Sequence, residues 1–105
     1  MEPIHVIGID KLSEDQIETA NTLANEYYEK LQRGMKNITS LIIHVKTYDD
    51  QGGKKRYAIN SRVSSPSHHF ESNKATDWDF ARTFHKTLKD LERQVEHGLH
   101  VSDQK

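Results

Sequence analysis

The sequence predicts an α+β fold, a two-layer sandwich in which two helices pack on one face of a four-stranded sheet. Two long segments, near residues 13–34 and 77–98, carry apolar residues at helical spacing. Four shorter segments are rich in β-branched residues or alternate between apolar and polar residues. The order of these segments is β-α-β-β-β-α, and two amphipathic helices need one apolar surface to cover. The inner face of the sheet supplies that surface, which leaves its other face open to solvent.

The first predicted strand is residues 4–9, "IHVIGI", a β-branched run that is followed by Asp10. A helix comes next, because Ser13 and Gln16 have the spacing of a capping box and Gly34 suits a helix C-terminus. The apolar side chains of this helix lie on one stripe: Ile17, Ala20, Ala24, Tyr27, Tyr28 and Leu31. The opposite face of the helix is acidic.

The middle of the chain predicts a β-hairpin of residues 37–48 and 54–64, joined by a turn at residues 49–53, "DDQGG". Its inner face is expected to carry six alternating apolar side chains: Leu41, Ile43, Val45, Tyr57, Ile59 and Val63. A short polar strand, residues 68–74, follows and is centred on Phe70.

The second helix is predicted to begin at Thr76 or Asp77, either of which can serve as its N-cap. Its expected buried face has a 3.6-residue period: Ala81, Phe84, Leu88, Leu91 and Val95. Gly98 predicts its end, and residues 99–105 are expected to form a flexible tail. The sequence thus predicts one domain over residues 1–98.

The composition is that of a small folded protein. Leu, Ile, Val and Phe make up 23 of 105 residues, and the formal net charge is −1, a balance that favours folding. The absence of cysteine excludes disulfides, thiolate zinc sites and thiol catalysis. There is no apolar run of bilayer length, and the start "MEPIHVIGID" lacks the features of a signal peptide. We therefore expect a cytoplasmic protein that does not associate with membranes.

Charge is distributed unevenly along the chain. Residues 1–35 carry seven acids and three bases, whereas residues 36–93 carry eleven bases and seven acids. Within the second helix, four bases follow each other at intervals of four, three and four residues, and we call Arg82, Lys86, Lys89 and Arg93 the basic stripe. This spacing aligns them on one helix face, almost opposite the apolar face. The basic stripe is either an ordinary solvated face or a surface that binds phosphates.

Further basic residues lie on the predicted hairpin: Lys46, Lys54, Lys55, Arg56 and Arg62. On the open face of a sheet they could reach phosphates, with Tyr57 or His69 available to stack on bases. The alternative is that "KKR" at residues 54–56 keeps an exposed hairpin soluble and unpaired at its edge.

Signatures of metal binding and of catalysis are missing. His68 and His69 are neighbours on a strand and point to opposite faces, and no H-x-E or HExxH pattern accompanies the histidines. There is neither a phosphate-binding glycine loop nor a G-x-S-x-G elbow. Asp77 and Asp79 are explained by a helix start. Trp78 is interpreted as an exposed or half-buried packing residue and not as a substrate platform. We expect no metal, no cofactor and no enzymatic activity.

Two segments carry a resemblance to a known family: "LSEDQIETANTLANEYYEKLQR" after the first strand and "FESNKATDWDFARTFHKTLKDLERQVEH" near the end. With the order β-α-β-β-β-α, the chain resembles the ribosome hibernation-promoting factor and ribosome-associated inhibitor family over roughly residues 4–97. The final helix departs from the short members of that family, because it runs into "EHGLHVSDQK" instead of a lysine-rich end, and the first helix is conspicuously acidic.

The resemblance implies binding to the small ribosomal subunit, where family members occupy the channel for messenger and transfer RNA and silence idle ribosomes. It carries over to basic positions of this chain: Arg82, Lys86, Lys89, Arg93, Arg56 and Arg62. The leading hypothesis is therefore a non-enzymatic RNA-binding regulator of translation, a stress or hibernation factor that binds ribosomal RNA and not DNA. The alternative is a protein-interaction module, such as a weak homodimer that pairs edge strands or sheet faces through an outward-facing Ile42.

Overall fold

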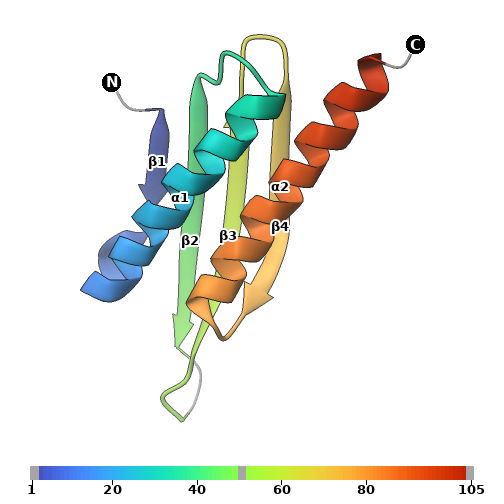
Figure 1. The fold of residues 1–105 in the computed structure, drawn as a ribbon. Helices are drawn as coiled ribbons and strands as arrows, with labels where there is room; N and C mark the ends of the chain where they lie inside the picture. Colours follow the sequence, from blue (N-terminus) through green and yellow to red (C-terminus); the bar gives the residue numbers. More distant parts are fainter. Residues whose placement is uncertain (1–2, 50–51, 104–105) are drawn as a thin grey trace.

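The computed structural model describes residues 3–49 and 52–103 and contains the predicted order of elements (Figure 1). The elements are β1 (Ile4–Ile7), the 3-10 turn η1 (Ile9–Lys11), α1 (Glu14–Gly34), β2 (Ser40–Asp49), β3 (Lys55–Ser64), β4 (His69–Asp77) and α2 (Phe80–Asp103). The sheet order is β1-β2-β3-β4, with β1 parallel to β2 and the other pairs antiparallel. Both helices cover the same face of the sheet, so the predicted α+β sandwich is confirmed.

The beginning of the chain differs from prediction in one detail. β1 ends at Ile7 and not at Ile9, because Gly8 adopts a left-handed conformation with φ of 89° and starts η1. A Cβ atom at this position would collide with the carbonyl oxygen of Val45 on the neighbouring strand. Only glycine combines this backbone conformation with so close an approach.

Helix α1 begins with the predicted capping box. The Gln16 amide donates to the Ser13 hydroxyl at 3.2 Å, and the Ser13 amide donates to the Gln16 side-chain oxygen at 3.1 Å. Four of the six predicted apolar positions are buried, whereas Ile17 and Tyr28 are half-buried at the margin of the core.

Strands β2 and β3 form the predicted hairpin, paired without interruption from Ser40↔Ser64 to Asp49↔Lys55. All six side chains expected on its inner face are buried. Gly52 and Gly53 have positive φ, as the predicted turn requires, while residues 50 and 51 of that turn lie outside the described residues.

The boundary between β4 and α2 corrects the sequence prediction. β4 extends to Asp77, which pairs with Tyr57, so Thr76 and Asp77 belong to the strand and neither caps the helix. Asp79 is the N-cap instead, since its carboxylate accepts from the Arg82 amide at 3.0 Å.

The two ends of α2 also differ from expectation. Its first buried side chain is Phe80, whereas Ala81 is exposed. At its other end α2 runs past Gly98 to Asp103, where the sequence predicts a tail. A Cβ atom at Gly98 would lie 2.7 Å from Cε1 of Phe70, so this glycine allows close packing inside the helix and does not end it.

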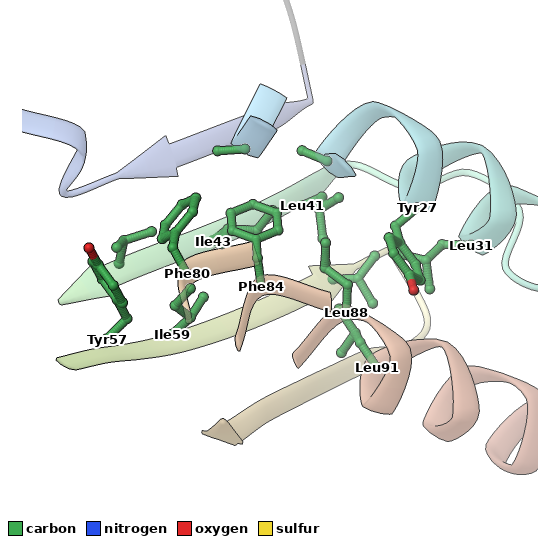
Figure 2. Close-up of a cluster of buried hydrophobic side chains, with 14 of the residues drawn as sticks. Tyr27, Leu31, Leu41, Ile43, Tyr57, Ile59, Phe80, Phe84, Leu88 and Leu91 are labelled. Atoms are coloured by element: carbon green, nitrogen blue, oxygen red, sulfur yellow. The ribbon is translucent and has the colours of Figure 1, made fainter. Parts of the chain in front are cut away.

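The hydrophobic core lies between the sheet and the helix pair (Figure 2). Phe84, Leu88 and Leu91 of α2 are fully buried and meet Leu41, Ile43 and Ile59 of the hairpin. At one end of the core, the Tyr57 ring packs edge-on against Phe80 with ring centroids 5.3 Å apart. This packing fixes which face of α2 is turned to solvent, and therefore the position of the basic stripe.

Candidate nucleic-acid interface

The basic stripe lies on the solvent face of α2, because the buried positions of this helix occupy the opposite side. All four side chains are exposed: Arg82, Lys86, Lys89 and Arg93. The structure therefore brings together the four helical residues that the sequence predicts as one surface.

The two halves of the basic stripe have different surroundings. The Asp77 carboxylate oxygen Oδ2 lies 3.9 Å from Arg82 Nη1 and 3.3 Å from Lys86 Nζ. Lys89 and Arg93 form no ion pair with any residue in the described part of the chain. Among the described residues, an ion-paired carboxylate thus accompanies the first half only.

Asp77 is held in its ionised form. The Trp78 amide donates to its carboxylate at 2.7 Å, which is the main reason why the pKa of Asp77 lies below its ordinary value of 3.8. Lys86 adds a hydrogen bond and a positive charge. The Asp77 side chain is only 19% exposed, so it lies beneath the two cations and does not project beyond them.

The other five predicted residues lie on the hairpin, three of them at outward positions of the sheet: Lys46, Arg56 and Arg62. Arg62 faces Glu71 across β3 and β4, with Nη1 3.7 Å from Oε1, a weak ion pair between half-exposed side chains. The Arg56 guanidinium lies over the Tyr48 ring, 5.1 Å from its centroid. Lys54 and Lys55 are exposed next to the turn.

The nine predicted residues do not form one continuous patch. The basic stripe lies on the solvent side of α2, whereas Lys46, Arg56 and Arg62 lie on the open face of the sheet. Figure 1 shows that both helices cover the other face. The two groups approach each other where β4 leads into α2, because Asp77 pairs with Tyr57, the neighbour of Arg56. The same end of the molecule carries the β2–β3 hairpin tip.

The aromatic residues at this end correct one prediction. Tyr57 is 6% exposed and its hydroxyl accepts a hydrogen bond from the Gln16 side chain at 2.9 Å, so it cannot stack on a base. His69, at the opposite end of β4, is exposed and lies 3.5 Å from the Glu71 carboxylate. Trp78 is exposed, as the sequence analysis allowed, whereas the exposure of Tyr48 was missed. The alternation of the strand places Tyr48 on the same outward face as Lys46, and this pattern could have predicted its exposure.

The open face of the sheet also contains a shallow hollow of about 310 Å³. Ile7 and Ile42 supply its apolar side, and polar groups including His44, Arg62 and Glu71 supply the rest. Ile7 is half exposed, so this face has a small apolar spot beside charged groups. Its position agrees with the outward orientation predicted for Ile42.

The histidines are dispersed over the surface. His68 stacks on Phe70 and bonds the Ser67 hydroxyl at 2.9 Å, and His85 bonds the Tyr27 hydroxyl at 2.8 Å. Within residues 3–49 and 52–103, no group of three or more potential metal ligands comes together. Across the same ranges, no helix is long and apolar enough to cross a membrane.

Comparison with known proteins places the fold. The N-terminal domain of protein Y from Thermus thermophilus matches with a TM-score of 0.55 and 17% identity, covering 90% of this chain and 93% of that domain. A ribosomal subunit interface protein from Coxiella burnetii matches with a TM-score of 0.51 and 18% identity, covering 97% of this chain and 96% of that protein. The chain has the fold of these proteins. The resemblance that the sequence suggests is thus confirmed for the fold.

Other comparisons gave no match. The sequence matches no family model and no curated protein. At 17% and 18% identity, the two solved structures establish a shared architecture over nearly the whole chain. The assignment of a function therefore depends on the chemistry of the surface.

Proposed function

We propose that this protein is a non-enzymatic, RNA-binding regulator of translation that binds the small ribosomal subunit and acts by occupying a site on it. The observation that carries the proposal is the exposed basic stripe on α2, in a protein whose formal net charge is −1. The fold shared with a ribosomal subunit interface protein supports the choice of the ribosome as partner.

The proposed mechanism is electrostatic. Lysine and arginine side chains displace the cations condensed on RNA phosphates, and this release of counterions drives binding without reading the sequence. Lys89 and Arg93 are the most effective members of the basic stripe, since Asp77 lies beside the other two. In the proposed role the protein works in the cytoplasm, without a cofactor, and an occupied ribosomal site excludes other ligands sterically.

Co-sedimentation with purified small ribosomal subunits across a salt series tests this proposal. We expect saturable binding that weakens steeply with salt and is lost in the double variant Lys86→Glu, Lys89→Glu. The matched control is Lys11→Glu, Lys36→Glu, which makes the same change of charge at exposed positions away from α2. A wild-type protein that stays in the supernatant at low salt would refute the proposal.

The second candidate function is a protein-interaction module, a weak homodimer through the open face of the sheet. The observation that favours it is the apolar spot formed there by Ile7 and Ile42. An apolar dimer responds little to salt, unlike binding to phosphates. Sedimentation equilibrium of the wild type and of Ile42→Lys distinguishes the two candidates, because only the dimer depends on this side chain.

A further inference from the structure

Two large side chains are exposed at the end of the molecule where the two basic surfaces meet. Trp78 is 53% exposed and Tyr48 is 42% exposed, and neither belongs to the hydrophobic core. Exposure of such rings to water is unfavourable, so two of them at one end of the molecule indicate a surface that a partner covers. The exposure of Trp78 agrees with the sequence analysis, and a binding role for this ring goes beyond the packing role favoured there.

Strand pairing places these aromatic residues close together. Tyr48 on β2 pairs with Arg56 on β3, and Asp77 on β4 pairs with Tyr57, the residue after Arg56. Trp78 follows Asp77 directly, so Tyr48, Arg56 and Trp78 belong to neighbouring positions across three strands. The Arg56 guanidinium lies over the Tyr48 ring, 5.1 Å from its centroid, and this contact holds the ring in place.

Cations surround this aromatic pair. Asp77, which precedes Trp78, lies within 3.9 Å of Arg82 and 3.3 Å of Lys86, so the first half of the basic stripe lies next to the tryptophan backbone. The segments 46–56 and 77–86 together contain six basic and four acidic residues, which leaves this end positively charged. Flat apolar rings among cations are the combination that binds bases and phosphates at once.

We propose that Tyr48 and Trp78 form a stacking platform for the unpaired bases of single-stranded RNA, with Arg56, Arg82 and Lys86 neutralising the adjacent phosphates. The inference deepens the proposed function and rests on it, because it names the kind of RNA that the surface takes. A duplex keeps the faces of its bases stacked inside, so only an unpaired strand can offer them to these rings.

A flexible single strand can also contact both basic faces of the molecule at once. The Cα atoms extend only 17 Å along the shortest principal axis, compared with 53 Å along the longest. A single strand that rounds this end reaches the open sheet face on one side and the basic stripe on the other. A stiff duplex follows one face only.

The fluorescence of the chain reports directly on this site, because Trp78 is its only tryptophan. The full-length protein is titrated with an oligouridylate of about 12 nucleotides, a length within the range of single-strand binding sites. The comparison ligand is a blunt RNA duplex with the same number of phosphates. We expect strong quenching of Trp78 fluorescence by the single strand and little quenching by the duplex.

Substitutions then measure the contribution of each ring, with binding of labelled oligouridylate followed by fluorescence anisotropy. Trp78→Ala and Tyr48→Ala are each expected to weaken binding by about fivefold or more, whereas Trp78→Phe retains most of the affinity. The control Ile9→Ala removes an exposed apolar side chain of η1, away from the open face of the sheet, and is expected to leave binding unchanged. Circular dichroism establishes that each variant is folded.

Several outcomes would overturn the platform. Unchanged affinity in both alanine variants would do so, as would equal quenching by the duplex. Loss of a concentration-dependent dimer in Trp78→Ala without loss of RNA affinity would assign the surface to a second copy of the chain. Failure of the platform is separable from failure of the proposed function: small subunits that still bind Trp78→Ala normally would reject the platform alone. Quenching by oligouridylate without ribosomal binding would reject only the ribosomal assignment.

Discussion

The two halves of the basic stripe differ in their acidic partners, and this difference predicts unequal losses of RNA affinity. Asp77 lies beside Arg82 and Lys86, which reduces the local charge of that half to +1. Lys89 and Arg93 have no ion-pair partner among the described residues, so both cations are available to phosphates. The perturbation is a pair of variants. Lys89→Ala with Arg93→Ala removes two cations, whereas Arg82→Ala with Lys86→Ala and Asp77→Asn removes two cations together with the carboxylate beside them.

The magnitude follows from counterion release. Each neutralised phosphate contributes about 0.9 to the slope of log affinity against log salt. Two contacts through Lys89 and Arg93 correspond to a slope of about 1.8. Their counterion release therefore raises the affinity by about 60-fold at 0.1 M salt, relative to 1 M salt, and this factor is lost in the variant. One net contact through Arg82 and Lys86 corresponds to a slope of about 0.9 and about eightfold.

The assay is filter binding or co-sedimentation of both variants with small ribosomal subunits at several salt concentrations. Alanine is a strong helix former and these positions are exposed, so α2 is expected to stay intact in both. The larger loss and the larger change of slope should belong to Lys89→Ala with Arg93→Ala. Equal losses in the two variants would refute the offsetting role of Asp77, and an unaffected Lys89→Ala, Arg93→Ala variant would refute phosphate binding by the basic stripe.

Three further predictions concern stability and charge. Asp77→Asn removes a carboxylate whose pKa is lowered in the folded protein, so the stabilising effect of Asp77 exists above pH 3.8 and is lost as the pH falls through the folded pKa. The melting temperatures of the wild type and the variant should therefore converge in acid. At neutral pH the variant should bind RNA more tightly, because a negative charge beside Arg82 and Lys86 is gone. Tyr27→Phe removes a 2.8 Å hydrogen bond to His85 and should cost about 1 kcal/mol in urea unfolding. Burial, then Glu92 and Glu26, raise the pKa of Tyr27, so the folded protein resists its ionisation, and the advantage over the phenylalanine variant should shrink above pH 10. Phe84→Ala empties a fully buried site and should lower the free energy of unfolding by about 3–5 kcal/mol. An unchanged midpoint in urea would contradict this prediction.

The elements with strong local signals could be predicted from the sequence. The capping box of Ser13 and Gln16 defined the start of α1, and strict alternation defined the faces of the β2–β3 hairpin. These signals depend on residues only a few positions apart, so they survive without knowledge of the tertiary structure. The helical spacing of the basic stripe belongs to the same class.

The boundary between β4 and α2 could not be predicted, because three residues there can cap a helix. Thr76, Asp77 and Asp79 all have the right side chains, and the choice is made by pairing of β4 with β3 as far as Asp77↔Tyr57. Likewise, Gly98 has the composition of a helix stop, but the ring of Phe70 packs against it from β4 and the helix continues. Long-range packing decided both cases against local propensity.

The candidate site was predicted in its parts but not in its arrangement. The ion pair of Arg62 with Glu71 depends on the β3–β4 register, which passes through an irregularity between Ile59 and Ser61. The burial of Tyr57 depends on Phe80, which lies 23 positions further along the chain. No local sequence pattern contains these long-range contacts. The pairing of β4 with β3 as far as Asp77 also determines the exposed position of Trp78.

The acidic helix α1 makes the charge distribution around the basic stripe asymmetric. α1 packs beside α2 in the same layer and carries exposed carboxylates, so an acidic helix lies on one flank of α2 (Figure 1). A polyanion is repelled from that flank and attracted to the other, where β4 ends and Trp78 is exposed. In the proposed function, an RNA strand would therefore be steered away from α1 and toward the end of the sheet, where the proposed platform and the hairpin cations lie. The formal net charge near zero is then consistent with RNA binding, because binding depends on the separation of charges over the surface and not on their sum.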